Sequence, residues 1–135
     1  MKAGILLKIL AGIFILFMLL AVTVANRGDG GHWWSFLQHI PHGDKLGHVG
    51  LMGTLSLLCN LALAPRRFHF LPVPVTRVTF VLFAIVTLEE ISHAFIATRT
   101  CDLFDWLADL AGLAAGQLFA GALRNVFSKH VPTNL

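Results

Sequence analysis

The sequence contains little charge for its length. Of its 135 residues, 13% are Asp, Glu, Lys or Arg and 56% are hydrophobic, whereas soluble domains carry about 25% charged residues. The mean hydropathy is +0.76. This composition excludes a soluble enzyme, a disordered tail and an acidic scaffold. The length is enough for one small domain, so we predict a single membrane domain spanning residues 1–135.

Cysteine is also scarce, and neither Cys59 nor Cys101 has metal-ligand spacing. Cys101 lies in a predicted turn, and Cys59 lies roughly 20 Å deeper along a predicted helix. Because a disulfide requires Cα atoms within about 7 Å, we expect no bond between them. We interpret Cys59 as a packing residue. The sequence also lacks a Gly-x-Ser-x-Gly elbow and a Cys–His pairing that would indicate a covalent nucleophile.

Long apolar runs are the main feature that is present, since about 20 residues of helix cross a bilayer. The predicted spans are Ile5–Ala25, Leu46–Ala64, Val78–Ala97 and Leu103–Leu123. The alternation over ~10 residues that is typical of membrane β-barrels is absent. The sequence therefore predicts an all-α, polytopic bundle of four transmembrane helices. The first run also resembles a signal peptide, but it exceeds the usual apolar length of about 7–15 residues, so we expect it to stay uncleaved.

The cations are distributed unevenly between the two predicted sides. The side that holds both termini has seven: Lys2, Lys8, Arg66, Arg67, Arg77, Arg124 and Lys129. The other side has Arg27, Lys45 and Arg99. This bias predicts cytoplasmic termini. We interpret Arg66 and Arg67 as a topology signal that contacts anionic lipid, and no loop is large enough for a nucleic-acid-binding face.

The first outer loop contains an amphipathic pattern. Four apolar residues recur at helical spacing: Trp33, Phe36, Leu37 and Ile40. With Pro41 following, the pattern predicts a short helix in the membrane interface, either as a strap or as a lid over a substrate. Trp33, Trp34 and Trp106 are typical interfacial anchors.

Ionisable residues gather in the outer half of the predicted bundle. Inserting a charged side chain at the centre of a transmembrane helix costs roughly 2.5–3.5 kcal/mol of free energy, so such residues are functional candidates. The predicted ligand-binding residues are Asp44, Lys45, His48, Glu89, Glu90, His93, Arg99, Asp105 and Asp109. Glu90 and Asp109 lie at the same predicted depth, roughly 9–10 Å below the outer boundary, so they can face each other. Helical spacing allows His93 to contact either Glu89 or Glu90.

Two interpretations of these residues remain open. In the first, Arg99 pairs with Asp105, and His48 or His93 pairs with Glu90, so that the charges only hold the helices together. Arg99 can instead form a bidentate pair with an anionic ligand. Alternatively, crowded carboxylates exchange protons near neutral pH. The candidate catalytic residues are then Glu90, Asp105, Asp109, His48 and His93.

The glycines and a partial metal motif complete the pattern. Gly112 and Gly116 follow Asp109 on one helix face, and Gly47, Gly50 and Gly53 narrow the second span, so another helix can approach closely. Glu90-x-x-His93 is half of a di-iron motif whose second half is missing. We predict no metal and no cofactor, although one histidine with two or three carboxylates could hold a divalent ion.

Between Asp44 and Gly121 the chain resembles the VanZ-like membrane proteins. Asp44-Lys45-Leu46-Gly47-His48 is similar to that family's Asp-Lys-x-x-His motif. The family also has a later series, Glu…Arg…Asp…Gly-x-x-x-Gly. This chain matches it in order with Glu90, Arg99, Asp105, Gly112 and Gly116. Four positions depart from the family pattern. His93 stands where the family usually has Gln and Asp109 where Asn is common, while Val49 and Met52 stand where aromatic residues are frequent.

The resemblance implies a bacterial cytoplasmic (inner) membrane protein of undefined activity. The family is named after a protein associated with low-level resistance to teicoplanin, which binds cell-wall precursors. We expect the polar residues to bind an anionic cell-envelope or lipid-linked component on the outer side. One alternative is a membrane enzyme that uses intramembrane Glu, Asp and His groups. Another is a small subunit of a membrane complex or a homo-oligomer, since four slim helices bury little core. Whether the protein is an enzyme stays open.

Overall fold

A computed structural model describes residues 2–28, 39–64, 66–68 and 74–129 of the chain. Most of the predicted interfacial helix, including Trp33 and Phe36, lies outside these residues. Ile40, at the end of that segment, lies in a bend with an exposed side chain.

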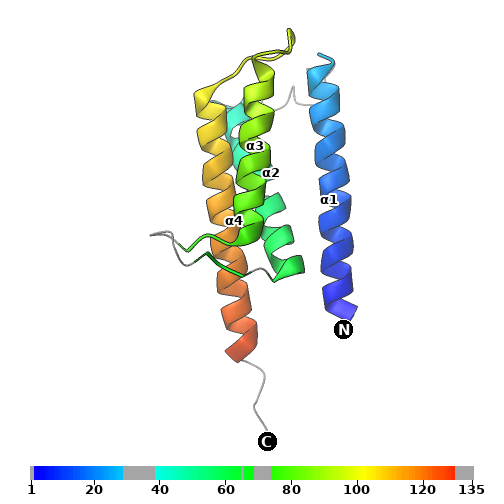
Figure 1. The fold of residues 1–135 in the computed structure, drawn as a ribbon, viewed down its shortest axis with the longest axis vertical. Helices are drawn as coiled ribbons and strands as arrows, with labels where there is room; N and C mark the ends of the chain where they lie inside the picture. Colours follow the sequence, from blue (N-terminus) through cyan, green and yellow to red (C-terminus); the bar gives the residue numbers. More distant parts are fainter. Residues whose placement is uncertain (1, 29–38, 65, 69–73, 130–135) are drawn as a thin grey trace, which may run out of the picture.

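Four α-helices make up the bundle: α1 (Lys2–Asn26), α2 (Gly43–Leu63), α3 (Arg77–His93) and α4 (Leu103–Lys129). Successive helices run in opposite directions, so α1 begins and α4 ends at the same end of the molecule (Figure 1). Apart from one isolated bridge between Arg67 and Thr76, the regular structure of the described residues is helical. The all-α prediction is confirmed for this part of the chain.

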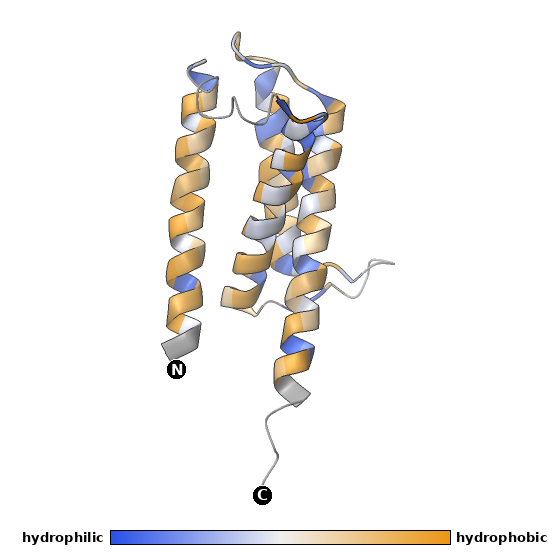
Figure 2. Ribbon diagram, turned by 180° about the vertical axis from the view of Figure 1, so that it is seen from behind, coloured by the Kyte–Doolittle hydropathy of each residue, from blue (hydrophilic) through white to orange (hydrophobic). Residues whose placement is uncertain are grey.

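Three helices of the described chain are long and apolar enough to cross a membrane. The segments are Gly4–Asn26, Gly43–Leu63 and Leu103–Phe127, and Figure 2 shows hydrophobic residues along most of α1. Large apolar side chains of α1 such as Ile13 and Leu16 are exposed, as expected for side chains that face lipid rather than water. These helices agree with the first, second and fourth predicted spans.

The third predicted span differs from α3. The prediction extended from Val78 to Ala97, but the helix ends at His93. Its 17 residues rise about 26 Å at 1.5 Å per residue, which is less than a hydrocarbon core of about 30 Å. The N–H of Ala94 bonds to the carbonyls of Ile91 and Ser92, which closes the last turn tightly. A fourth membrane crossing at α3 therefore stays a prediction.

The closest helix contact joins α2 to α4 through glycines. A Cβ atom added at Gly112 would lie 2.6 Å from the carbonyl oxygen of Val49, and one added at Gly116 would lie 2.8 Å from the backbone nitrogen of Leu57. Gly53 of α2 faces Gly112 directly. The prediction that this face of the fourth span receives another helix is confirmed, and the backbones approach because no side chain separates them.

A buried polar network joins the helices at the end of the bundle where α2 ends and α3 begins. The Asn60 amide donates to Thr79 Oγ1 at 3.0 Å and accepts from Thr76 Oγ1 at 2.7 Å. Thr76 also caps α3 by accepting from the backbone nitrogen of Thr79. Gln117 of α4 accepts from the backbone nitrogen of Thr76 at 2.9 Å. The buried polar groups named here all have hydrogen-bond partners, so we interpret this network as structural.

The two cysteines are both free, as predicted. Cys59 is buried in the apolar core beside Leu55 and Leu113, which confirms its packing role. Cys101 is exposed in the connection between α3 and α4. Partial desolvation and the adjacent charge of Glu90 raise the pKa of the Cys101 thiol.

Candidate functional site

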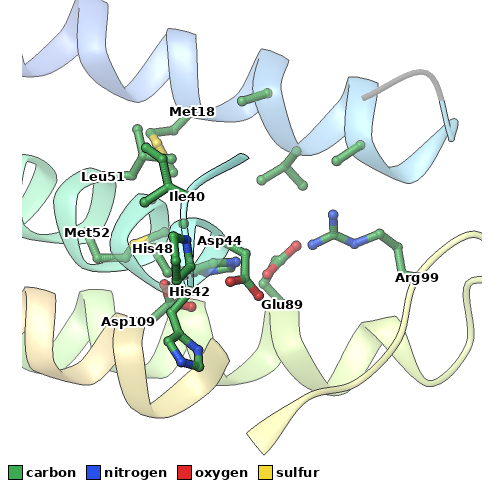
Figure 3. Close-up of a pocket in the computed structure, with 16 residues that line it drawn as sticks. Met18, Ile40, His42, Asp44, His48, Leu51, Met52, Glu89, Arg99 and Asp109 are labelled. Carbon is green, nitrogen blue, oxygen red and sulfur yellow. Dashed lines mark hydrogen bonds and ion pairs between the residues drawn. The ribbon is translucent and has the colours of Figure 1, made fainter. Parts of the chain in front are cut away.

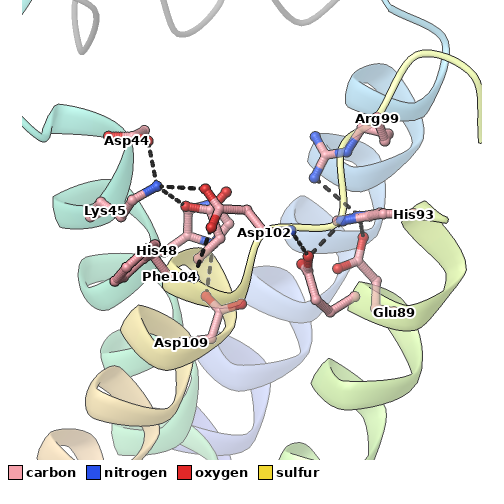
Figure 4. Close-up of polar contacts among 11 residues, drawn as sticks. Asp44, Lys45, His48, Glu89, His93, Arg99, Asp102, Phe104 and Asp109 are labelled. Atoms are coloured by element: carbon pink, nitrogen blue, oxygen red, sulfur yellow. Dashed lines mark hydrogen bonds and ion pairs between the residues drawn. The ribbon is translucent and has the colours of Figure 1, made fainter.

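Ten ionisable residues lie at the end of the bundle where α3 ends and α2 and α4 begin. We call this region the polar end, and its members are Asp44, Lys45, His48, Glu89, Glu90, His93, Arg99, Asp102, Asp105 and Asp109. Nine of them were predicted as ligand-binding residues, and the tenth is Asp102. Their contacts divide them into two groups, one between α2 and α4 and one on α3 (Figure 4).

Lys45 is the centre of the first group. Its Nζ atom lies 2.8 Å from Asp44, 3.2 Å from Asp102 and 2.5 Å from Asp105. These acids come from α2, from the connection before α4 and from α4 itself. The ammonium group has three donors, so the three carboxylates occupy all of them. Lys45 thus holds the start of α2 against the start of α4.

His48 and Asp109 form a second pair between the same helices. The His48 Nδ1 atom lies 2.8 Å from Asp109 Oδ1, and its Nε2 atom lies 3.9 Å from Asp105. The Asp109 side chain is 3% exposed and that of His48 is 29% exposed. A buried carboxylate therefore orients an imidazole that remains partly accessible.

The group on α3 consists of Glu89, Glu90, His93 and the neighbouring Arg99. The His93 ring lies between the two glutamates, with Nε2 2.7 Å from Glu89 Oε1 and Nδ1 3.1 Å from Glu90 Oε2. Its Nε2 atom is also 3.1 Å from Arg99 Nη2. The prediction that His93 contacts a glutamate is confirmed, and it contacts both.

Asp102 links the two groups and was not predicted as a site residue. Its carboxylate contacts Lys45, while its backbone N–H donates to Glu90 Oε1 at 2.7 Å. The side chain also accepts from the backbone N–H of Phe104 at 2.8 Å, and this bond, followed by the bond from Lys45, lowers the pKa of Asp102. An aspartate directly before a helix is a favoured N-cap. That signal was available in the sequence.

Two predicted contacts, Arg99 with Asp105 and Glu90 with Asp109, are not found among the described residues. Asp105 pairs with Lys45 instead. Of the two histidines predicted as possible partners of Glu90, His93 contacts it and His48 pairs with Asp109. Among the described residues, no hydrogen bond or ion pair joins Glu90 to Asp109. The glycine contact explains these differences, because it turns the face of α4 that carries Asp105 and Asp109 toward α2.

A cavity of about 690 Å³ opens beside the polar residues. One part of its wall is apolar, with Met18 and Val22 of α1 and Leu51 of α2, and another part contains ionisable side chains (Figure 3). Those side chains are Asp44, His48, Glu89, Arg99 and Asp109, with His42 from the turn before α2. The volume falls in the range of small-molecule sites, about 300–1,000 Å³.

In comparisons with known proteins, no family model, curated protein or solved structure matches the chain.

Proposed function

We propose that this chain is a VanZ-like protein of the bacterial inner membrane that binds a lipid-linked cell-envelope component at an outward-facing polar end. The observation that carries the proposal is the cavity, in which an apolar wall adjoins a wall of ionisable groups. An amphipathic ligand needs both surfaces. Its hydrocarbon part would lie against α1 and α2, and its polar part against Glu89, Arg99 and Asp109.

Arg99 is the residue best suited to an anionic group of that ligand. Lys45 is engaged by three carboxylates, whereas no ion pair with a carboxylate is found for Arg99 within the described part of the chain. Arg99 lines the cavity, and its planar guanidinium matches phosphate through two parallel hydrogen bonds. One phosphate at Arg99 is therefore the preferred anionic contact.

The charge balance of the polar end restricts the rest of the ligand. Six carboxylates are present with only two permanent cations, Lys45 and Arg99. A ligand that carries only negative charge would be repelled by Asp44, Glu89 and Asp109. A lipid-linked sugar or amine would supply hydrogen-bond donors to these carboxylates together with a phosphate for Arg99. Because teicoplanin binds cell-wall precursors, a protein that binds such a precursor would also affect tolerance of teicoplanin.

A binding experiment with a polyprenyl phosphate tests the proposal. Thermal stability of the purified protein in detergent is measured with polyprenyl phosphate and with the matching polyprenol, which lacks the phosphate. Because a ligand that binds the native state raises its stability, we expect a larger shift with the phosphate. Arg99→Gln should weaken that binding about tenfold.

Arg77→Gln is the matched control, because Arg77 is an exposed arginine at the other end of α3. It should bind the polyprenyl phosphate like the wild type. Equal shifts with the phosphate and the polyprenol, or equal loss of binding in both arginine variants, would contradict the proposal.

A membrane enzyme is the second candidate, and the His48–Asp109 pair favours it. A buried aspartate that accepts from Nδ1–H leaves Nε2 of the imidazole as a proton acceptor, and both residues border the cavity. Incubation with a polyprenyl diphosphate, followed by measurement of released phosphate, distinguishes the candidates. Release of phosphate that is lost in His48→Gln supports an enzyme. Polyprenyl diphosphate that binds and is recovered chemically unchanged supports a binding protein.

A further inference from the structure

A groove of about 340 Å³ lies between α3 and α4 and extends toward the end of the bundle where α3 begins. Most of its lining is apolar, and it includes Phe80, Phe83, Leu110, Ala114 and Leu118. Leu110 and Leu118 are about two helical turns apart, so the groove follows α4 for roughly 12 Å. An exposed apolar surface of this kind marks a place where a membrane component binds, and the shape fits part of a lipid acyl chain.

Two arginines lie close together just beyond this groove. Gln117 lines the groove, and Gly121 follows it by one turn on the same face of α4. A Cβ atom added at Gly121 would lie 3.5 Å from Arg67 Nη2, so the guanidinium of Arg67 lies over this glycine. Arg124 is less than one turn further along α4, and its charge and that of Arg67 repel each other. Two guanidinium groups therefore lie at the same end of an apolar groove.

The connection between α2 and α3 holds Arg67 in this place. Two backbone hydrogen bonds flank the residue. The N–H of Phe68 donates to the carbonyl of Val75 at 2.8 Å, and the carbonyl of Arg66 accepts from the N–H of Arg77 at 3.0 Å. The backbone on both sides of Arg67 is therefore fixed, and the fold directs this arginine to the surface of α4.

No carboxylate of the described chain neutralises these two arginines. Arg124 donates to the backbone carbonyl of Asn60, which carries no charge. The Asp and Glu residues in the described ranges all lie at the polar end. Arg77 is directed elsewhere, because its guanidinium lies over the ring of Phe68, 5.9 Å from the centroid. Two positive charges held together without a counter-ion attract an anion to the space beside them.

We propose that the groove between α3 and α4 binds one anionic phospholipid, with its phosphate held by Arg67 and Arg124. The site is apolar where an acyl chain would lie and cationic where the phosphate would lie, and guanidinium groups bind phosphate through paired hydrogen bonds. The distribution of cations predicts that this end faces the cytoplasmic leaflet, whose anionic lipids attract basic residues. The inference does not rest on the proposed function, which concerns the opposite end of the bundle.

Native mass spectrometry of the full-length protein, released from detergent micelles, measures how many lipids stay bound and how tightly. Phosphatidylglycerol is compared with phosphatidylcholine of identical acyl chains. We expect one phosphatidylglycerol per chain to bind about tenfold more tightly than phosphatidylcholine. Arg67→Gln and Arg124→Gln should each weaken phosphatidylglycerol binding about fivefold. Lys8→Gln is the matched control, because Lys8 is an exposed cation at the same end of the molecule and its helix, α1, does not contact α4 in the described structure.

Arg67→Glu tests the pairing of the two charges without disturbing the core, since Arg67 is exposed. The introduced carboxylate would take the place of the lipid phosphate beside Arg124. We expect this variant to lose its preference for phosphatidylglycerol while it keeps or exceeds the thermal stability of the wild type in a zwitterionic detergent. Loss of lipid binding without loss of stability separates a lipid site from a purely structural role of the arginines.

Ala114→Phe tests the groove itself, because Ala114 is exposed and lines it. The added ring would fill the groove, so binding of both lipids should fall. Ala111→Phe, at an exposed position of α4 outside the groove lining, should bind like the wild type. Equal affinity of the wild type for the two lipids, equal losses in Lys8→Gln and Arg67→Gln, or unchanged phosphatidylglycerol binding in Arg67→Glu would overturn the proposal.

Discussion

Asp102 shows how one residue joins groups from three helices. Its carboxylate contacts Lys45 of α2 and caps α4, and its backbone nitrogen bonds to Glu90 of α3. Two of these interactions use the side chain, but they need different properties. The cap needs an oxygen acceptor, whereas the ion pair needs a negative charge.

Asp102→Asn separates the two properties, since asparagine caps helices as well as aspartate does. The pKa of Asp102 is lowered in the folded state, so its contribution to stability is present above the ordinary carboxyl pKa and is lost as pH falls through the folded value. We expect the wild type to lose more thermal stability than Asp102→Asn below about pH 4. Thermal unfolding in detergent between neutral and acidic pH measures the difference.

Asp102→Ala is the companion variant, because it removes the cap as well as the charge. It should be less stable than Asp102→Asn at every pH. Parallel pH profiles for the wild type and Asp102→Asn would show that the charge of Asp102 does not stabilise the fold.

At the scale of the helices, the contact between α2 and α4 decides which residues of the polar end meet. Small residues allow the two backbones to approach, and this approach places Lys45 against Asp105 and His48 against Asp109. The rotation of α4 about its axis therefore decides which acids meet which cations. A change in the glycine contact should disturb the ion pairs together with the packing.

Gly112→Ala tests this dependence. The added methyl group would lie 2.6 Å from the carbonyl oxygen of Val49 and 2.9 Å from the nitrogen of Gly53, and backbone atoms cannot rotate away. We expect destabilisation of about 1–3 kcal/mol, measured by unfolding in mixed micelles. Gly50→Ala is the matched control on α2, where a Cβ atom meets nothing within 4 Å. It should be neutral or stabilising by about 0.5–1 kcal/mol, and equal losses in both variants would contradict the packing argument.

At the scale of the whole molecule, the polar end lies opposite the end where α1 begins and α4 ends (Figure 1). The distribution of cations predicts that the polar end faces outward. Cys101 lies beside this end and is exposed, whereas Cys59 is buried in the core. Labelling of the Cys101 thiol therefore reports on the orientation of the protein in the membrane, and labelling of the Cys59 thiol reports on loss of core packing.

We expect a membrane-impermeant maleimide to label Cys101 in intact spheroplasts and to leave Cys59 unreacted until the protein is unfolded. Mass spectrometry of the labelled peptides identifies the site. A Cys101→Ser variant should give no labelling in intact spheroplasts. Labelling of Cys101 only in inverted vesicles would reverse the predicted orientation.

Local sequence was sufficient for features that depend on neighbouring residues along one helix. Apolar length and composition predicted α1, α2 and α4, while the spacing of Glu89 and Glu90 from His93 predicted the contacts of that histidine. These features depend on the helical repeat, which fixes the relative positions of residues three and four apart. The end of α3 was predicted four residues too late, because apolar residues continue beyond His93.

Sequence patterns were sufficient to predict the all-helical architecture of the described chain, the glycine face of α4 and the residues of the polar end except Asp102. The partners of these residues became known only from the packed bundle: Lys45 contacts three acids, His48 pairs with Asp109, and Asp102 lies between the two groups. Helical periodicity sets the relative positions of residues along one helix only. The rotation of one helix against another is set by backbone contacts such as that between Gly53 and Gly112, and these become visible only when the helices are packed together.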